Sequence, residues 1–220
     1  MEIKKIILVL FWILLSSCSS NQSIFENVNR IKSITIYSEK KPLKSFTREM
    51  LNHINYPLIE IKTEGILKQA LMLPLSTRDG YVNYTSGSGQ IITMKGAVVI
   101  RTNGMNNHLL SMETNENSPL IQKTPVDKWP LSGKREFKFL NSLNQQTIIS
   151  FDCRFETGHK ENIEIVEYKY NLTLVREKCK NNNKQIINMF WVGKHGFIWK
   201  SFPWIGEGNY AEISIIKPAI

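Results

Sequence analysis

Histidine and cysteine are scarce in this chain of 220 residues, and their scarcity limits the chemistry that it can carry. The four histidines and three cysteines are His53, His108, His159, His195, Cys18, Cys153 and Cys179. They show no spacing typical of a metal site, so we expect no metal and no other cofactor. No glycine-rich loop opens a helix, which argues against the common phosphate-binding fingerprints. Gly87-Ser88-Gly89 lacks the spacing of a nucleophile elbow.

A hydrophobic run long enough to span a bilayer is also missing. The N-terminal run Ile6–Leu15 has ten apolar residues and follows Lys4 and Lys5. A short apolar core behind a basic start is typical of a signal peptide. We therefore expect a signal peptide over residues 1–17, a tether over residues 18–30, and a single β-rich domain over residues 31–220.

The leader ends in Leu15-Ser16-Ser17-Cys18, which resembles the lipobox of bacterial lipoproteins. The resemblance implies cleavage before Cys18 and acylation of that residue, with chains such as palmitate. Two or more acyl chains hold a protein stably on a membrane. Ser19 follows the cysteine where enteric lipoproteins of the inner membrane carry Asp, so the resemblance favours the periplasmic face of the outer membrane. An ordinary secretory leader with a chance cysteine is the alternative.

Cys153 and Cys179 are the two cysteines left after Cys18. In an exported chain, two remaining thiols favour one disulfide. For a loop of this size, the chain-entropy estimate of its stabilisation is about 3.5 kcal/mol. Two free thiols are the alternative.

The net charge of +9 falls by one when Glu2, Lys4 and Lys5 leave with the signal peptide. A basic surface suits an acidic polymer, lipid head groups or nucleic acid. An exported protein rarely meets nucleic acid, so we expect no nucleic-acid partner. A solvated, lysine-rich surface without a partner is the plainer explanation.

Hydrophobic periodicity predicts one short helix followed by many strands. Phe46–Ile54 has helical spacing, and Pro57 ends it. Pro74 predicts an edge or a bulge, Asp79-Gly80 predicts a hairpin turn, and the polar segment 106–130 is expected to cross a sheet end. The expected strands are Ile31–Tyr37 (or an extended lead-in), Leu58–Thr63, Gln69–Ser76, Tyr81–Tyr84, Gln90–Met94, Ala97–Thr102, Arg135–Leu140, Thr147–Phe155, Ile163–Tyr168, Asn171–Glu177, Asn188–Val192, Phe197–Phe202 and Ala211–Ile216. We expect an all-β fold built as an antiparallel meander, with the helix packed on it.

Aromatic and basic residues alternate in the predicted hairpin near the end of the chain. Lys194, His195, Trp199 and Lys200 are our candidates for contact with an acidic polysaccharide. Strict alternation would place Trp199 on one strand face, and Ile198, Lys200 and Phe202 on the other. Aromatic residues on paired strands more often pack across the strands, which is the alternative.

Glu161, Glu164 and Glu167 are close enough in sequence to be considered as paired acids for glycan cleavage. Their spacing does not show that two of them face one sugar. Carboxylates on the exposed face of a strand explain them more simply, so we predict no catalytic residue.

Several segments resemble the YjbF/GfcB-type lipoproteins. Near the end of the chain, these are Asn188–Val192, Gly196–Ser201 and Ile216-Lys217-Pro218. Further segments are Gly96–Gly104, Leu109-Leu110, Ser118-Pro119-Leu120, Asn55-Tyr56-Pro57 and the pair Glu177 and Cys179. Gly193 departs from the family's usual Asp, and Ser86–Gly89 stands where a Trp-containing strand is common.

The resemblance implies a mostly antiparallel, partly closed β-barrel. It also implies a lipoprotein encoded with exopolysaccharide or group 4 capsule genes, acting as a non-enzymatic accessory in polymer assembly or secretion. Its expected partners are the outer membrane, and acidic polysaccharide or the capsule export proteins that carry it. A lipid or glycolipid carrier with an apolar cavity is the alternative, and a glycan-modifying enzyme is a third.

Overall fold

The computed structural model describes residues 47–64, 69–105, 108–140, 143–206 and 208–218. The expected signal peptide, Cys18, the tether and the segment Ile31–Tyr37 lie outside these described residues. Within the described ranges, no helix has the length and apolar character needed to cross a membrane.

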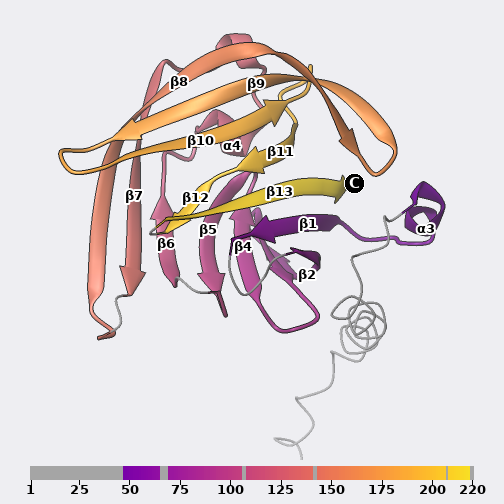
Figure 1. Cartoon of the computed structure of the whole chain (residues 1–220), viewed down its shortest axis with the longest axis horizontal. Coiled ribbons are helices and arrows are strands. Elements are labelled where there is room, and N and C mark those ends of the chain that lie inside the picture. The colour runs from indigo at the N-terminus through magenta and orange to yellow at the C-terminus, as the bar shows by residue number, and fades with distance from the viewer. Residues whose placement is uncertain (1–46, 65–68, 106–107, 141–142, 207, 219–220) are drawn as a thin grey trace, which may run out of the picture. The chain divides into compact units, whose positions relative to one another are not determined.

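The described residues form one large antiparallel sheet with little helix (Figure 1). Its strands are β1 (Leu58–Thr63), β2 (Gln69–Arg78), β3 (Tyr81–Thr85), β4 (Ile91–Lys95), β5 (Val98–Asn103), β6 (Leu109–Glu113), β7 (Ser132–Leu140), β8 (Gln146–Ile165), β9 (Tyr168–Lys180), β10 (Gln185–Val192), β11 (Ile198–Phe202), β12 (Trp204–Gly206) and β13 (Asn209–Lys217). The helical elements are α3 (Arg48–Asn52), α4 (Pro119–Gln122) and the 3-10 turn η1 (Val126–Lys128).

The order of the strands closes the sheet almost completely. It runs β5-β4-β3-β2-β1-β13-β11-β10-β9-β8-β7-β6, and β12 pairs with β13 outside this path. The two end strands, β5 and β6, follow one another in the chain and meet where the Leu109 N–H donates to Thr102 Oγ1 at 3.1 Å. The fold is therefore a nearly closed antiparallel barrel, as expected.

The single expected helix is confirmed within the described residues. Thr47 caps α3, since its hydroxyl oxygen accepts a hydrogen bond from the Met50 N–H at 3.3 Å. Leu51 is buried. The Lys217 ammonium donates to the Leu51 and Ile54 carbonyl oxygens, so α3 packs against the end of β13.

Two expectations about strands were wrong. Segment 106–130 contains β6, which pairs with β7, besides the part that crosses the sheet end. Thr147–Phe155 and Ile163–Tyr168 were expected as separate strands, but Gln146–Ile165 is the single long strand β8. It arches over the body of the barrel together with β9 (Figure 1).

The turn between β8 and β9 falls at Val166 and Glu167, where no turn residue marks it. Their φ angles are 42° and 66°, a region that costs a β-branched residue such as valine free energy. Arg48 holds this turn: its guanidinium donates to the Ile165 and Val166 carbonyl oxygens at 2.7 Å each. Its backbone N–H donates to Glu167 Oε2 at 3.0 Å.

The segment around α4 crosses one end of the barrel, as expected for part of segment 106–130. The Ala97 N–H donates to the Leu120 carbonyl oxygen at 2.8 Å. Gly96 and Gly196 sit in tight turns with φ of 60° and 78°, and a Cβ on either would overlap with the backbone of residues 120–124. These glycines let two hairpin turns close onto the crossing segment.

Two apolar clusters lie on opposite faces of the sheet. Trp204 is central to the barrel core, with its ring 4.9 Å from that of Phe137 and 5.7 Å from that of Phe151. The smaller outer cluster is Leu172, Leu174 and Trp191, with Ile163, Tyr170, Met189, Trp199 and Phe202 packed on it. Strands β9 and β10 are consequently apolar on both faces along part of their length.

Candidate functional site

The predicted hairpin forms from β10 and β11, and its turn presents Lys194 and His195 to solvent. The Gly193 N–H donates to the Phe197 carbonyl oxygen at 2.8 Å and closes that turn. Trp199 is half-buried, with its ring 4.3 Å from that of Tyr170.

Lys200 differs from the other members of the predicted group because a carboxylate neutralises it. Its ammonium lies 2.9 Å from Glu212 Oε2 and above the Trp191 ring. The structure thus places two predicted residues in solvent and two in packed positions. Their role in binding a polysaccharide stays a prediction.

A β-bulge changes which hairpin residues share a face. Val192 lies opposite Ile198, but Trp191 lies opposite Lys200, so Trp199 is the extra residue. Ile198 joins the barrel core, whereas Trp199 and Phe202 pack on the outer cluster. The strict alternation expected for this strand was therefore wrong.

A pocket of about 300 Å³, here called the end pocket, opens where the barrel end meets α4. Its apolar lining includes Val82, Tyr84, Met94, Leu120, Ile121, Phe197, Ile198, Trp199, Ile213 and Ile215. The charged residues of its described lining are three lysines, Lys123, Lys200 and Lys217, and no carboxylate lines it. Two predicted residues, Trp199 and Lys200, thus belong to its wall.

Two side chains of this lining, Tyr84 and Ser201, are buried and carry a hydroxyl. Tyr84 is only 8% exposed, and burial raises the pKa of its hydroxyl. Among the described residues, none forms a hydrogen bond with the Tyr84 hydroxyl. In this described part of the chain, the fully buried side-chain polar atoms without a partner are Ser118 Oγ, Arg135 Nη2 and Glu177 Oε1. The Tyr84 hydroxyl is not one of them, so it can be reached from the pocket and can donate a hydrogen bond to a ligand atom there.

The wall of the end pocket also borders a charge network on the outer side of the sheet. Lys62 and Lys200 both contact Glu212, at 3.4 and 2.9 Å. Burial raises the pKa of the Glu212 carboxyl, but the hydrogen bond and charge of Lys200 and the charge of Lys62 outweigh it. The pKa is therefore lowered, and Glu212 stays ionised.

A second concave surface, here called the outer basic groove, lies along β7, β8 and β9 and has a volume of about 580 Å³. Its charged residues are Lys134, Asp152, Arg154, Glu156, Lys178 and Lys180. Lys134, Asp152 and Lys180 lie in one cross-strand row, and Arg154 lies opposite Lys178. The lining of this groove therefore contains four cationic side chains and two carboxylates.

This groove was not predicted from the sequence. The sequence pattern that could have indicated it is the charged residue at every second position, at 152, 154 and 156 and again at 178 and 180. That spacing marks an outward face, but the strand pairing that gathers these residues is not visible in the sequence.

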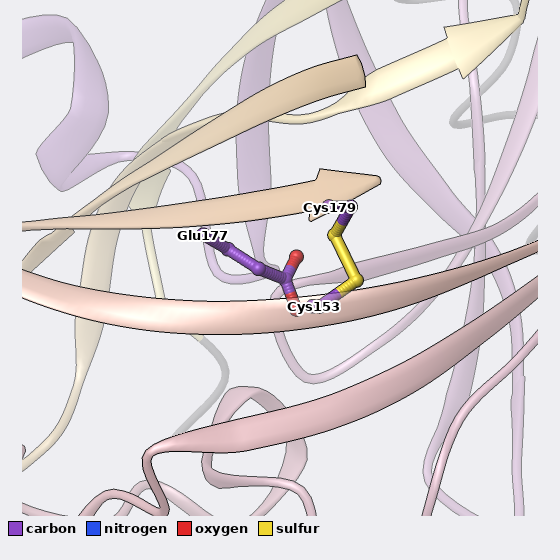
Figure 2. A group of neighbouring side chains, drawn as sticks. All are labelled: Cys153, Glu177 and Cys179. Carbon is purple, nitrogen blue, oxygen red and sulfur yellow. A yellow bond between two sulfur atoms is a disulfide. The ribbon is translucent and has the colours of Figure 1, made fainter. Parts of the chain in front are cut away.

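Cys153 and Cys179 are cross-strand neighbours on β8 and β9 and form the expected disulfide (Figure 2). The Glu177 carboxylate points toward them, and the potential ligand atoms of all three residues lie within 4.8 Å of one another. Because the two sulfur atoms are bonded to each other, this cluster offers no thiolate to a metal ion.

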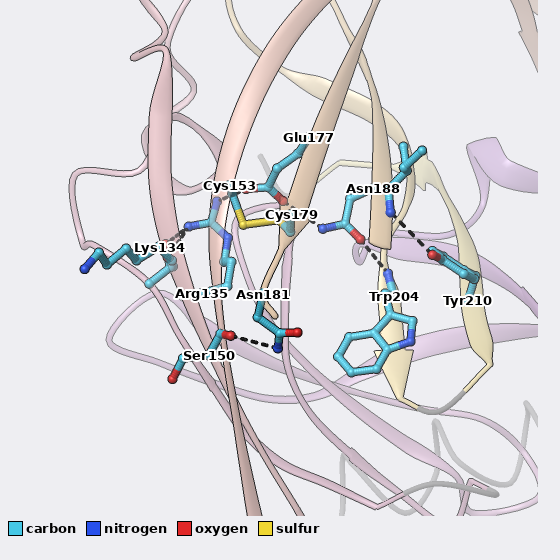
Figure 3. The surroundings of a disulfide bond; sticks show 12 residues. Lys134, Arg135, Ser150, Cys153, Glu177, Cys179, Asn181, Asn188, Trp204 and Tyr210 are labelled. Carbon is cyan, nitrogen blue, oxygen red and sulfur yellow. Dashed lines mark hydrogen bonds and ion pairs between the residues drawn. A yellow bond between two sulfur atoms is a disulfide. The ribbon is translucent and has the colours of Figure 1, made fainter. Parts of the chain in front are cut away.

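Beside the disulfide, a polar network crosses the barrel core (Figure 3). Arg135 Nη2 lies 2.6 Å from Glu177 Oε1, and both side chains are almost fully buried. The contact is out of hydrogen-bond alignment, so it acts through charge. Asn188 donates to Glu177 Oε2 at 2.7 Å and accepts from the Trp204 N–H at 2.8 Å.

Two of the three carboxylates considered for glycan cleavage, Glu161 and Glu167, have structural partners, and Glu164 is exposed on β8. Glu161 Oε2 accepts a hydrogen bond from the Trp191 indole at 2.7 Å. Glu167 accepts one from the backbone of Arg48. Each therefore holds a neighbouring element in place.

Comparison with known proteins agrees with this architecture. The crystal structure of the hypothetical lipoprotein YmcC from Escherichia coli K12 is similar, with a TM-score of 0.71 and 15% sequence identity. The match covers 92% of this chain and 99% of that one, and at this identity it shows the fold. None of the curated proteins matches the sequence. The model of the family described as group 4 capsule polysaccharide lipoprotein gfcB, YjbF matches residues 26–215. The chain therefore belongs to the YjbF family of group 4 capsule polysaccharide lipoproteins.

Proposed function

We propose that this protein is a non-enzymatic accessory in capsule or exopolysaccharide assembly or secretion. It is held on the periplasmic face of the outer membrane by a lipid on Cys18. The observation that carries this proposal is the family match, which spans residues 26–215. The Leu15–Cys18 pattern supports the anchor.

Contact with an acidic polysaccharide, or with the export proteins that carry it, is part of the proposal. Lys194 and His195 are solvent-exposed at the turn of the predicted hairpin. The outer basic groove adds four cations over three adjacent strands. Attraction between such a surface and a polyanion falls as salt shortens the Debye length, which is about 8 Å at physiological ionic strength.

Deletion of the gene, with measurement of surface polysaccharide, tests this function. Loss of surface polymer that the wild-type gene restores is the expected result. The Cys18→Ala form should restore much less, because it lacks the lipid and leaves the outer membrane. Full surface polymer in the deletion strain would refute the accessory role, and full rescue by Cys18→Ala would refute the anchor.

The basic surfaces are tested separately by binding of the purified protein to the cell's own polymer at low and high salt. We expect Arg154→Glu with Lys180→Glu to weaken binding in the outer basic groove, and Lys194→Glu to weaken it at the hairpin. Lys128→Glu with Lys169→Glu is the matched control, since both lysines are exposed and lie outside these surfaces. Binding that is equal in all these variants would remove both surfaces from the proposal.

A further inference from the structure

The end pocket combines an apolar interior with a positively charged rim. Its walls come from β3, β4, α4, β11 and β13, so separate parts of the chain converge on one space. Small-molecule sites are mostly apolar, with a few placed polar groups, and range upward from about 300 Å³. The end pocket lies at the lower limit of that range, which suits one narrow hydrocarbon chain.

The charges at the end pocket favour an anion. Of its three lysines, Lys200 is neutralised by Glu212. Among the described residues, Lys123 has no carboxylate partner, and its ammonium lies over the Phe197 ring at 5.6 Å. Lys217 donates to the backbone carbonyl oxygens of Leu51 in α3 and of Ile54 just after it, which leave its positive charge in place. Lys123 and Lys217 thus give the lining positive charge that no carboxylate of the described lining offsets.

The hydroxyl of Tyr84 supplies a polar point within the apolar wall. The side chain is more than nine-tenths buried and lines the pocket, and its hydroxyl has no hydrogen-bond partner among the residues that the structure describes. An oxygen at the base of a ligand's head group can accept that hydrogen bond. The hydrocarbon part then lies against the isoleucine and methionine side chains.

From these observations we propose that the end pocket binds a single hydrocarbon chain that carries an anionic head group, either a phosphate or a carboxylate. The chain occupies the apolar interior, and the head group lies at the rim near Lys123 and Lys217. Such amphiphiles are found in membranes. The pocket borders the end of β13 that contacts α3. This inference concerns ligand binding and does not depend on the role in polymer secretion.

Photo-crosslinking of the full lipoprotein in phospholipid vesicles tests the proposal. The probes are medium-chain alkyl phosphate, carboxylate and alcohol, each with a photoreactive group at the end of the chain. We expect the phosphate or the carboxylate to label peptides that line the end pocket, and the alcohol to label them less. Whichever anionic probe labels more strongly identifies the source of the ligand. Equal labelling by all three probes, or labelling spread over the surface, would overturn the proposal.

Three variants test whether the labelling occurs in the end pocket. Val82→Phe fills the pocket and should lower labelling about tenfold or more, because excluding two methylenes already costs a factor of that order. Lys123→Glu should lower labelling by the anionic probes about two- to fivefold. Tyr84→Phe, which keeps the shape of the side chain, should lower it by a similar factor.

Lys128→Glu is the matched control for Lys123→Glu, because Lys128 is exposed on the same crossing segment and does not line the pocket. It should leave labelling unchanged. An intact Cys153–Cys179 disulfide and an unchanged circular dichroism spectrum confirm that each variant is folded. If Val82→Phe does not fold, Lys123→Glu and Tyr84→Phe test whether the ligand binds in the end pocket. Wild-type labelling in both of these folded variants would refute the assigned site.

Discussion

The buried pair of Arg135 and Glu177 provides a quantitative test of what holds the barrel core together. Glu177→Gln keeps the shape of the side chain and an oxygen that can accept from Asn188, but it removes the negative charge. The Arg135 guanidinium then remains buried, with the Thr114 hydroxyl and the Lys134 carbonyl oxygen as its partners. The substitution therefore measures the contribution of the Glu177 charge to stability separately from the contribution of side-chain packing.

The expected loss of unfolding free energy follows from the burial of the pair. The side chains are 3% and 1% exposed and lie 2.6 Å apart. Breaking such a pair by removing one partner costs about 3 to 5 kcal/mol. We expect about 3 kcal/mol, at the low end, because two acceptors for Arg135 remain. Replacing both residues, as Arg135→Met with Glu177→Gln, removes the stranded charge and should recover at least about 1 kcal/mol of that loss.

Urea unfolding of the purified protein, followed by tryptophan fluorescence, measures these differences. With a slope near 3 kcal/mol/M, the Glu177→Gln midpoint should fall by about 1 M. Glu156→Gln is the control, because Glu156 is 52% exposed and lies 2.7 Å from Lys178. An exposed pair of this kind contributes at most about 1 kcal/mol. If Glu177→Gln costs no more than Glu156→Gln, or if the double variant is less stable than the single one, the reasoning about the buried charge is wrong.

Three further predictions concern stability. Gly196→Ala should cost about 3 kcal/mol and Gly89→Ala about 1 kcal/mol by thermal unfolding, because both have positive φ but only a Cβ at 196 overlaps with other backbone; equal losses would contradict the tight crossing. The folded-state pKa of Glu212 lies below its ordinary value of 4.5, so stability from this group is present above pH 4.5 and lost as pH falls through the folded pKa. Glu212→Gln should therefore flatten the acid side of the stability profile, and an unchanged profile would argue against the network. Replacing both Cys153 and Cys179 by Ala should cost about 3.5 kcal/mol in urea unfolding, and a loss below about 1 kcal/mol would show that the crosslink adds little.

Local signals in the sequence were sufficient for some of the hairpins. Asp79 and Gly80 form the expected turn, with φ of 51° and 79°, and the expected bulge occurs at Pro74. At these positions the turn residues and the alternation of side chains act over only a few residues, so the turn and the bulge can be predicted from the local sequence. The short helix capped by Thr47 is of the same kind.

Features set by distant partners were not predictable. The β8–β9 turn at Val166 and Glu167 has no glycine or asparagine, and Arg48, 118 residues away from Val166, holds it. The bulge at Val192 is likewise invisible in the spacing of aromatic residues. The end pocket and the outer basic groove each require several strands to be adjacent, which depends on the pairing order rather than on any one segment.

The pairing of β1 with β13 has a consequence for how the protein is made. Lys62 lies opposite Glu212, which follows it by 150 residues. Synthesis delivers β1 long before its partner, so one side of β1 stays open until the last strand emerges. Pairings between such distant residues form slowly and leave strand edges accessible in the meantime. A chain that stops short of β13 leaves that side of β1 without its partner strand and cannot complete the barrel.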